Sequence, residues 1–234
     1  MEAIVLAGGL GTRLRAAVPD LPKPMAPVGG RPFLEYLLGY WAGQGVTRFI
    51  VSVGYRREAI TGHFGDAWRG VAVSYAIEHA PLGTGGGLLL ASASLAAPGP
   101  FLVLNGDTYF EVALGALRDF HAARRAQVTL SLFRSPQQGR YTGIRTGANG
   151  EVLSLDAGEK DGLANGGVYL MERSLLEDAP RHADQPCSFE SDILPDALRA
   201  GKRVYGREFS GTFIDIGVPE DYARAATLLD KGVT

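Results

Sequence analysis

Two basic residues near the start of the chain accompany a glycine-rich turn, and together they could bind phosphate groups. The turn is Gly8-Gly9-Leu10-Gly11-Thr12-Arg13, and Lys23 follows ten residues later between two prolines. Three glycines in four positions allow a sharp turn and a close approach of the backbone to a ligand, and successive N–H groups in such a turn can bind an anion. Arg13 adds a fixed cationic fork. The pattern therefore predicts a polyphosphate-binding loop with Arg13 and Lys23 directed at the ligand.

The short motifs of nucleotide-binding loops do not fit this segment. The dinucleotide fingerprint G-x-G-x-x-G would need glycine where Leu14 stands, and the P-loop pattern would need a Gly-Lys-Ser/Thr string at a spacing that is not present. The alternative interpretation is a structural turn with incidental charges. The choice between the two depends on a longer stretch of sequence.

Two aspartates lie at or within predicted apolar strands, where a carboxylate is either part of a ligand site or a buried charge. Asp107 follows a buried strand predicted at 101–104, and ligands of α/β sheets bind at the carboxyl ends of strands. Asp215 lies within the apolar segment 212–216, and a buried aspartate needs a partner, of which a metal ion is one. The alternatives are that Asp107 caps a following helix and that Asp215 forms a buried salt bridge.

Alternating strands and helices over the first 130 residues must position these side chains. This alternation is typical of a parallel, doubly wound sheet, whereas the short later strands favour mixed or antiparallel pairing. With no linker or repeat in the sequence, we expect a single domain, 1–234. The predicted strands are 3–7, 48–53, 71–77, 101–104, 128–133, 141–146, 151–155, 167–171, 203–207 and 212–216, and the predicted helices are 32–44, 56–64, 84–95, 114–125, 190–199 and 219–230.

The composition is that of an ordinary globular protein. Of 234 residues, 46% are apolar and 21% charged, and the net charge of -2 gives no basic field for nucleic acid or for a membrane surface. Cys187 is the only cysteine, which excludes an intrachain disulfide and a thiolate metal cluster. The apolar runs are too short for a membrane span or a secretion signal, so we expect a cytoplasmic protein.

The opening string as a whole resembles the signature of the sugar-nucleotide pyrophosphorylases (nucleotidylyltransferases). The resemblance rests on Leu-Ala-Gly-Gly-Leu-Gly-Thr-Arg-Leu at 6–14 and Pro-Lys-Pro-Met at 22–25. It implies a Rossmann-like α/β domain of the GT-A type, with a mixed, mostly parallel sheet flanked by helices. The nucleotide-binding half would be about 1–130 and the sugar-binding half about 131–234. In this family the loop wraps a nucleoside triphosphate, which implies nucleotide contacts from Leu6, Ala7, Gly8, Gly9, Gly11, Thr12, Arg13 and Lys23.

Three further segments resemble motifs of the same family. The segment 78–87, Glu-His-Ala-Pro-Leu-Gly-Thr-Gly-Gly-Gly, resembles its base-binding loop and implies nucleotide contacts from Leu82, Gly83 and Thr84, with Gly85–Gly87 permitting close approach. Asn105-Gly106-Asp107 resembles the metal-binding motif, and the segment around Asp215 resembles the second metal site. The resemblance therefore implies that Asp107 and Asp215 hold Mg²⁺, a cation that takes carboxylate and phosphate oxygens.

The sugar side is implied by matches that are less complete. Glu159-Lys160 resembles the Glu-Lys-Pro motif, in which Lys grips the sugar phosphate and Glu a sugar hydroxyl, but Asp161 replaces the proline. An alternative is an exposed charged turn. Tyr141-Thr142-Gly143 resembles a Tyr-Gly pair with Thr142 as an extra residue. The implied sugar-phosphate contacts are Gly143, Glu159, Lys160, Asn165 and Glu190, and for Glu190 an ordinary acidic helix start is the alternative.

The resemblance implies an enzyme that joins a sugar 1-phosphate to a nucleoside triphosphate and releases pyrophosphate. Arg13, Lys23, Asp107 and Lys160 would be its catalytic residues, acting by positioning and charge neutralisation. Rival hypotheses are a regulator of the same fold without catalysis, and a glycosyltransferase, whose Asp-x-Asp motif is not matched at Asp107-Thr108-Tyr109. Relatives of this length are usually oligomers, which implies a homodimer.

Within the family, the segments 18–28, 31–34, 105–110 and 213–217 most resemble the D-glycero-α-D-manno-heptose 1-phosphate guanylyltransferases. This branch implies GTP as the nucleotide and GDP-heptose as the product, a precursor of bacterial capsule polysaccharide, lipopolysaccharide or another surface polysaccharide. The alternatives are mannose 1-phosphate with GTP, and a hexose 1-phosphate with UTP or dTTP. The residues alone do not select the base.

Overall fold

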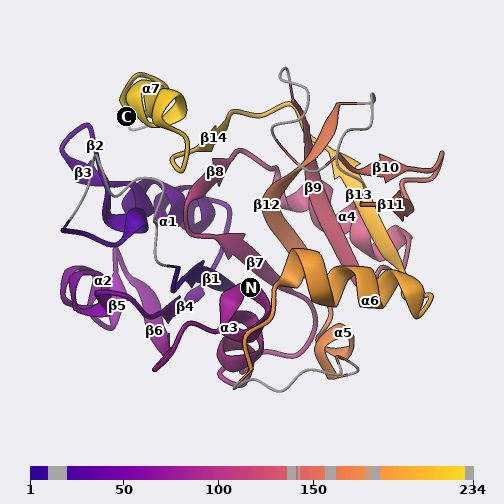
Figure 1. Cartoon of the computed structure of the whole chain (residues 1–234), viewed down its shortest axis with the longest axis horizontal. Coiled ribbons are helices and arrows are strands. Elements are labelled where there is room, and N and C mark those ends of the chain that lie inside the picture. Colours follow the sequence, from indigo (N-terminus) through magenta and orange to yellow (C-terminus); the bar gives the residue numbers. More distant parts are fainter. Residues whose placement is uncertain are drawn as a thin grey trace.

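The computed structural model describes residues 1–9, 20–135, 141, 143–155, 162–177, 179 and 185–229. Within these residues an eight-stranded sheet forms the centre of the molecule (Figure 1). The central strand β1 pairs in parallel with β4 and β7, β4 with β6, and β9 with β13. Only β12, which is antiparallel to β7 and β9, and the edge strand β5 depart from this direction. In sheet order the strands are β13 (Val204–Glu208), β9 (Val128–Arg134), β12 (Leu163–Met171), β7 (Phe101–Asn105), β1 (Glu2–Ala7), β4 (Arg48–Val53), β6 (Val71–Ile77) and β5 (Ala67–Trp68).

Helices cover both faces of the sheet, because successive side chains of each buried strand point to opposite sides. In β1, Ala3, Val5 and Ala7 pack with one set of helices and Ile4 with the other. This confirms the predicted mixed, mostly parallel sheet flanked by helices. On the first face lie α1 (Phe33–Gly43), α2 (Arg57–Phe64) and α4 (Leu114–Ala123), and on the second lie α3 (Gly83–Ser92), α5 (Arg173–Glu177), η2 (Phe189–Ile193) and α6 (Leu194–Arg199).

Three short strand pairs lie outside the main sheet. They are β2 (Pro27–Val28) with β3 (Arg31–Pro32), β8 (Thr108–Phe110) with β14 (Phe213–Asp215), and β10 (Arg145–Thr146) with β11 (Val152–Ser154). The last helix, α7 (Pro219–Leu229), packs Ala225 and Leu229 against Val28. None of the helices in the described ranges is both long enough and apolar enough to cross a membrane.

Most predicted elements are present with shifted ends, and one alternative is wrong. Asp107 does not cap a helix, because strand β8 follows it directly and α4 begins only at Leu114. The strand predicted at 141–146 is limited to Arg145–Thr146 among the residues described there, and β12 begins at Leu163 rather than at 167. The very short strands β2, β3, β5 and β8 were not predicted, since two or three residues carry no periodicity.

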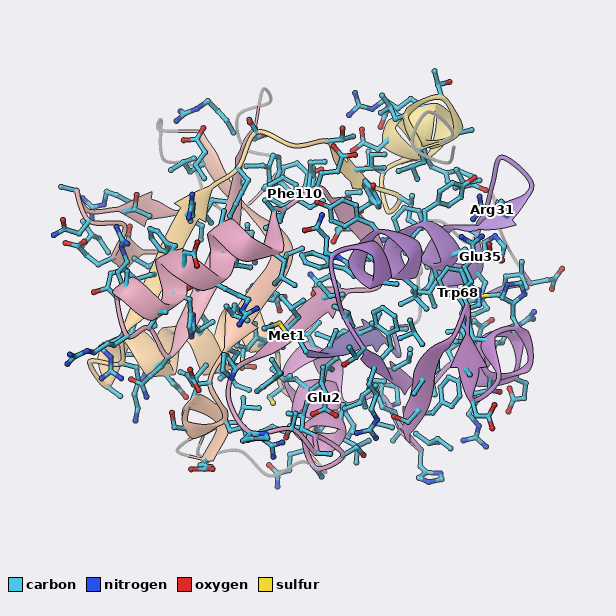
Figure 2. The ribbon with its side chains drawn as sticks, turned by 180° about the vertical axis from the view of Figure 1, so that it is seen from behind. Met1, Glu2, Arg31, Glu35, Trp68 and Phe110 are labelled. Carbon is cyan, nitrogen blue, oxygen red and sulfur yellow. The ribbon has the colours of Figure 1, made fainter. Side chains whose placement is uncertain are left out.

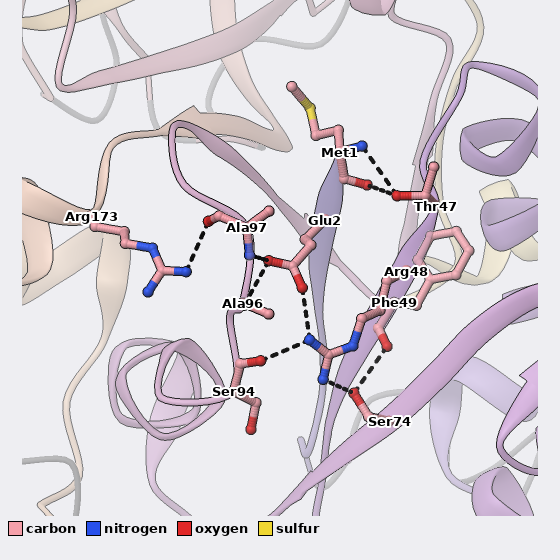
Figure 3. Close-up of polar contacts among 10 residues, drawn as sticks. All are labelled: Met1, Glu2, Thr47, Arg48, Phe49, Ser74, Ser94, Ala96, Ala97 and Arg173. Atoms are coloured by element: carbon pink, nitrogen blue, oxygen red, sulfur yellow. Dashed lines mark hydrogen bonds and ion pairs between the residues drawn. The ribbon is translucent and has the colours of Figure 1, made fainter.

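A partly buried ion pair between Arg48 and Glu2 fastens the end of the sheet where β1 begins (Figure 3). The Glu2 carboxylate accepts from Arg48 Nη1 at 2.7 Å and from the N–H groups of Ala96 and Ala97 at 2.9 and 2.8 Å. Arg48 also donates to the carbonyl of Ser94 at 2.9 Å. The contacts join β1 and β4 to the loop that leads from α3 to β7. In the reverse view, Phe110, which lies beyond the carboxyl end of β7, is in the upper part of the molecule, and Glu2 is in the lower part (Figure 2).

The Glu2→Gln variant should lower the free energy of unfolding by about 1–2 kcal/mol at pH 7, because it weakens three charge-assisted hydrogen bonds. Burial opposes the ionisation of Glu2, yet the hydrogen bonds from Ala97, Arg48 and Ala96 hold its pKa below 4.5. A lowered pKa stabilises the fold above the unfolded pKa, and this stabilisation is lost as the pH falls through the folded value. Urea unfolding should therefore show a gap between variant and wild type that shrinks below pH 4.5. The exposed Glu177→Gln serves as control, and a gap independent of pH would contradict the prediction.

Candidate functional site

Three charged side chains from distant segments meet beyond the carboxyl end of β7. Lys23 Nζ lies 2.5 Å from Asp107 Oδ2 and 3.7 Å from Asp215 Oδ1. The side chains of Lys23 and Asp215 are 13% and 17% exposed, whereas that of Asp107 is 39% exposed. The cluster is therefore largely withdrawn from water but open on the side of Asp107. The salt bridge that was the alternative for Asp215 is present, and its partner is a residue of the opening signature.

Local backbone pairing brings the two aspartates together. Asp215 is the last residue of β14 and lies opposite Thr108 of β8, so that it neighbours Asp107. The N–H of Ile216 donates to the Asp107 carbonyl at 3.1 Å, and the N–H of Gly217 donates to Asp215 Oδ1 at 2.7 Å. A side chain at Gly217 would overlap the ammonium of Lys23. Glycine at this position therefore permits the three charges to approach one another.

The electrostatics of the cluster suit a hard cation. Burial raises the pKa of Asp215, Lys23 opposes this effect, and the negative charge of Asp107 adds to it. Two carboxylates lie beside a single ammonium group here. Carboxylate oxygens, together with phosphate oxygens, are the ligands that a divalent cation such as Mg²⁺ takes. The described residues contain no group of three or more His, Cys, Asp or Glu side chains suited to a metal ion. Among the described residues, Asp107 and Asp215 are a pair of carboxylates that could hold one together with ligand oxygens.

The predicted base-binding loop lies at the start of α3 and packs tightly against the segment before η2. The loop and this segment are joined through Cys187: its N–H donates to the Leu82 carbonyl at 2.8 Å, and its carbonyl accepts from the Gly85 N–H at 2.9 Å. Gly83 has a φ of +72°, and a Cβ there would overlap that carbonyl. A Cβ at Gly85 would lie 2.8 Å from Cys187 Sγ. These glycines therefore admit a neighbouring protein segment at close range.

A chain of hydroxyl groups joins this loop to the predicted sugar side. Glu190 accepts from Thr84 Oγ1 at 2.6 Å, from Ser188 Oγ at 3.2 Å and from the Tyr169 hydroxyl at 3.1 Å. Asn165 Nδ2 in turn donates to the Tyr169 hydroxyl at 2.7 Å. Burial, with the nearby charge of Glu190, raises the pKa of Tyr169 well above its ordinary value, so the phenol stays a donor. The network connects the two predicted subsites through one carboxylate.

An irregularity in β12 places Asn165 in this network. Between Asn165 and Tyr169 the register of β12 against β9 shifts, and Gly167 in this bulge has a φ of +71°. The N–H of Gly167 donates to Asn165 Oδ1 at 3.1 Å. Gly143 forms an antiparallel bridge with Ala164, which places it beside Asn165. The start of β12 thus brings together two of the residues predicted to contact the sugar phosphate, Gly143 and Asn165.

The start of the signature lies beside the metal motif. Leu6 and Ala7 end β1, the Leu6 carbonyl accepts from Gly106 N–H at 2.9 Å, and a Cβ at Gly106 would lie 2.7 Å from that carbonyl oxygen. Gly9 follows at an exposed position. The other residues predicted for the site lie outside the described residues: Gly11, Thr12, Arg13, Glu159 and Lys160.

One buried carboxylate that touches the predicted base-binding loop was not singled out from the sequence. Glu78 directly follows β6 and is only 9% exposed, and its carboxylate accepts from Ser52 Oγ at 2.7 Å and from Leu82 N–H at 3.2 Å. The available signal was an acidic residue at the carboxyl end of a predicted strand, the same signal that identified Asp107. Glu78 was not predicted because the motif in segment 78–87 directs attention to Leu82 and to the glycines that follow it, and Glu78 is the first residue of that segment.

The fold and the arrangement of these charged residues are those of nucleotide-using transferases. Similarity to known proteins supports this class. Residues 2–232 match the nucleotidyl transferase family, and the chain belongs to it. The chain is 38% identical to D-glycero-α-D-manno-heptose 1-phosphate guanylyltransferase of Aneurinibacillus thermoaerophilus over 96% of each chain. It is 36% identical to the Campylobacter jejuni protein of the same name, over 95% of this chain and 97% of the relative. A crystal structure of HddC from Yersinia pseudotuberculosis complexed with GMP-PN has 34% identity and a TM-score of 0.83, covering 97% of this chain and 98% of that one.

Thr84→Val and Tyr169→Phe should each destabilise the protein by about 1–3 kcal/mol, because each removes one of the three hydroxyl donors to the Glu190 carboxylate. Since both hydroxyls donate to the same carboxylate, the double variant should deviate from additivity by about 0.5–3 kcal/mol. Urea unfolding of the two single variants and the double variant measures this coupling. Pairing Thr84→Val with Ser74→Ala, which belongs to the Arg48 contacts, should give additive effects. Additive effects in both pairs would contradict a shared network.

Proposed function

We propose that this chain transfers a guanylyl group from GTP to D-glycero-α-D-manno-heptose 1-phosphate, giving GDP-heptose and pyrophosphate. The supporting similarity is to guanylyltransferases of this name over nearly the whole of both chains, and to a solved relative complexed with GMP-PN. The structural observation that carries the proposal is the contact of Lys23 with Asp107 and Asp215. It joins the cation of the predicted triphosphate loop to the two predicted metal ligands.

In the proposed reaction an oxygen of the sugar phosphate attacks the α-phosphorus of GTP in line. The new P–O bond forms as the bond from the α-phosphorus to the bridging oxygen breaks, and pyrophosphate leaves with the electron pair. Lys23, with Arg13, binds the triphosphate and the leaving pyrophosphate, while Lys160 holds the attacking phosphate. The protein's part is to position the two phosphates and to neutralise their charge.

Asp107 and Asp215 would hold Mg²⁺ in this proposal. The ion supplies positive charge that neutralises phosphate oxygens when it is bound. The Gly217 N–H keeps Asp215 Oδ1 in place through a 2.7 Å hydrogen bond. Asp107, the more exposed of the two, presents its carboxylate toward the open side of the cluster.

On the sugar side, Gly143, Asn165 and Glu159 would contact the sugar phosphate together with Lys160. Glu190 would also contact the sugar, and because it accepts from the Tyr169 hydroxyl it would hold Tyr169 and, through it, Asn165. The product would serve the synthesis of a bacterial capsule or another surface polysaccharide. The homodimer implied by the resemblance remains part of the proposal.

Substrate competition tests the proposal directly. With GTP, ATP, UTP, CTP and dTTP in turn, and heptose or mannose 1-phosphate as the acceptor, pyrophosphate release should be fastest with GTP and the heptose. Release should depend on the sugar 1-phosphate, because the acceptor oxygen is the nucleophile. A preference for UTP or dTTP would refute the guanylyl assignment, and a preference for mannose 1-phosphate would refute the heptose. A lack of pyrophosphate release with every pair would favour a regulator without catalysis.

Asp107→Asn and Asp215→Asn should each lower turnover about 100-fold or more, because each removes one charge from the pair proposed to hold Mg²⁺. Pyrophosphate release measured over a Mg²⁺ titration should show a raised requirement for the ion in any activity that is left. Circular dichroism should show an intact fold. The exposed Asp119→Asn on α4 is the matched control and should behave as the wild type. If either site variant keeps near-normal turnover and Mg²⁺ dependence, that residue does not hold the ion.

A further inference from the structure

Tyr169 lies at the centre of the hydrogen-bond network between the two predicted subsites. It belongs to β12, and its side chain is fully buried. Its hydroxyl donates to Glu190 Oε1 at 3.1 Å and accepts from Asn165 Nδ2 at 2.7 Å, and the side chain of Asn105 is a further hydrogen-bond partner. A hydroxyl has one donor and two acceptor positions, so these three partners use all of them. The phenol is thus satisfied by protein groups and would act on a ligand through these neighbours.

The bond to Glu190 leads to the nucleotide side of the site. Glu190 Oε2 accepts from Thr84 Oγ1 at 2.6 Å, and the same hydroxyl accepts from the N–H of Phe189 at 2.9 Å. Thr84 is the second residue of α3 and is a predicted nucleotide contact. The ring of Phe189 packs edge-on against that of Tyr169, with 4.9 Å between the ring centres. A change in the position of the base-binding loop would therefore reach Tyr169 through one carboxylate and one aromatic contact.

The bonds to the two asparagines lead to the sugar side and to the metal motif. Asn165 is a predicted sugar-phosphate contact in the bulge of β12, and Asn105 ends β7 two residues before Asp107. The bulge packs directly on this motif, because a Cβ at Gly167 would lie 2.6 Å from Thr108 Oγ1 and 3.0 Å from Asn105 Nδ2. The acceptor half of the site is therefore positioned by groups that also contact the phenol.

Two polar atoms beside this bulge are unsatisfied. Asn105 Oδ1 and Thr108 Oγ1 are buried, and neither has a hydrogen-bond partner among the described residues. Buried polar atoms without partners are uncommon and costly, and both side chains border the bulge at Gly167. A shift of the bulge changes which partners these atoms can reach. Coupling between two sites requires an element with two arrangements that both ligands bias, and the unsatisfied atoms point to the bulge as that element.

We propose that the Tyr169 hydroxyl couples the two substrates, so that binding of either one raises the affinity for the other. This inference rests on the proposed function, because it concerns the nucleotide and the sugar 1-phosphate of that same site. A nucleotide that orders the loop at Thr84 also fixes Glu190, and through Tyr169 it orients Asn165 before the sugar phosphate binds. The second ligand then has less conformational entropy to remove. The coupling is reciprocal by thermodynamic linkage, and Tyr169 is its positioning residue.

The test uses a GTP analogue with a methylene group between its α- and β-phosphates, which cannot be cleaved there. Calorimetric titrations in the presence of Mg²⁺ give the Kd of this analogue without and with saturating heptose 1-phosphate. For the wild type, heptose 1-phosphate should lower this Kd about 5-fold or more, the lower end of the usual range for coupled sites. In Tyr169→Phe this factor should fall toward one. The Kd of the analogue alone should change little, because Glu190 keeps its bonds from Thr84 and Ser188.

The coupling factor separates positioning from a structural role, since damage to the fold weakens binding of the analogue alike in both titrations. Tyr75→Phe removes a hydroxyl that donates to the Gly65 carbonyl at 2.6 Å. It is the matched control and should keep the wild-type factor. Thr84→Val should lower the factor, whereas Thr84→Ser, which keeps a hydroxyl, should retain it. This second pair tests the same path if Tyr169→Phe fails to fold.

The outcomes distinguish the coupling from the reaction itself. A wild-type factor near one, or a factor unchanged in Tyr169→Phe, would overturn the inference while leaving the guanylyl assignment intact. A wild type whose pyrophosphate release prefers UTP or dTTP would instead overturn the proposed function.

Discussion

The site depends on one electrostatic constraint: two carboxylates, one of them mostly buried, must be placed side by side without an uncompensated charge. Removing Asp215 from water is unfavourable, and the neighbouring Asp107 adds repulsion, which together raise its pKa. The ammonium of Lys23 offsets both effects, since its Nζ lies 2.5 Å from Asp107 Oδ2 and 3.7 Å from Asp215 Oδ1. The protein meets this constraint by pairing β14 with β8 outside the main sheet and by keeping Gly217 beside the ammonium. The cluster thereby ties the first thirty residues to the last strand before α7.

The sequence predicts the layers of this fold well and the contacts between distant segments poorly. The apolar run 48–53 and the helical stripe within the predicted helix 32–44 carry the period of their element, and the structure confirms both elements as β4 and as α1, Phe33–Gly43. The pairing of β8 with β14 has no such signal, because each strand has three residues and the partners are about a hundred residues apart. The helix-cap alternative for Asp107 failed for the same reason, since it considered only the residues that follow Asp107 in sequence.

The same limit applied within the site. Thr84, Asn165 and Glu190 were each predicted from a motif, but the sequence does not show that Tyr169 links them, or that Thr84 and Glu190, 106 positions apart, share a hydrogen bond. The position of Glu78 after a predicted strand can be read from the sequence, but its contacts with Gly8 and Ser52, which follow or belong to other strands, cannot. Motifs identify which residues are present at a site, whereas the burial and the partners of a carboxylate depend on neighbours brought by the whole sheet.

The two ends of the sheet use carboxylates in different ways. At the end where β1 begins, the Glu2 carboxylate is paired with the Arg48 guanidinium and accepts from two backbone N–H groups, so its charge is balanced and stabilises the fold. At the other end, Glu78 has only neutral donors, and Asp107 and Asp215 share a single ammonium. Negative charge at that end is therefore incompletely balanced by the described residues. Such a deficit suits the proposed substrates, because a bound divalent cation would supply the positive charge that Asp107 and Asp215 lack. Lys23 would then be free to bind phosphate, which explains how one ammonium could serve both the resting cluster and the triphosphate.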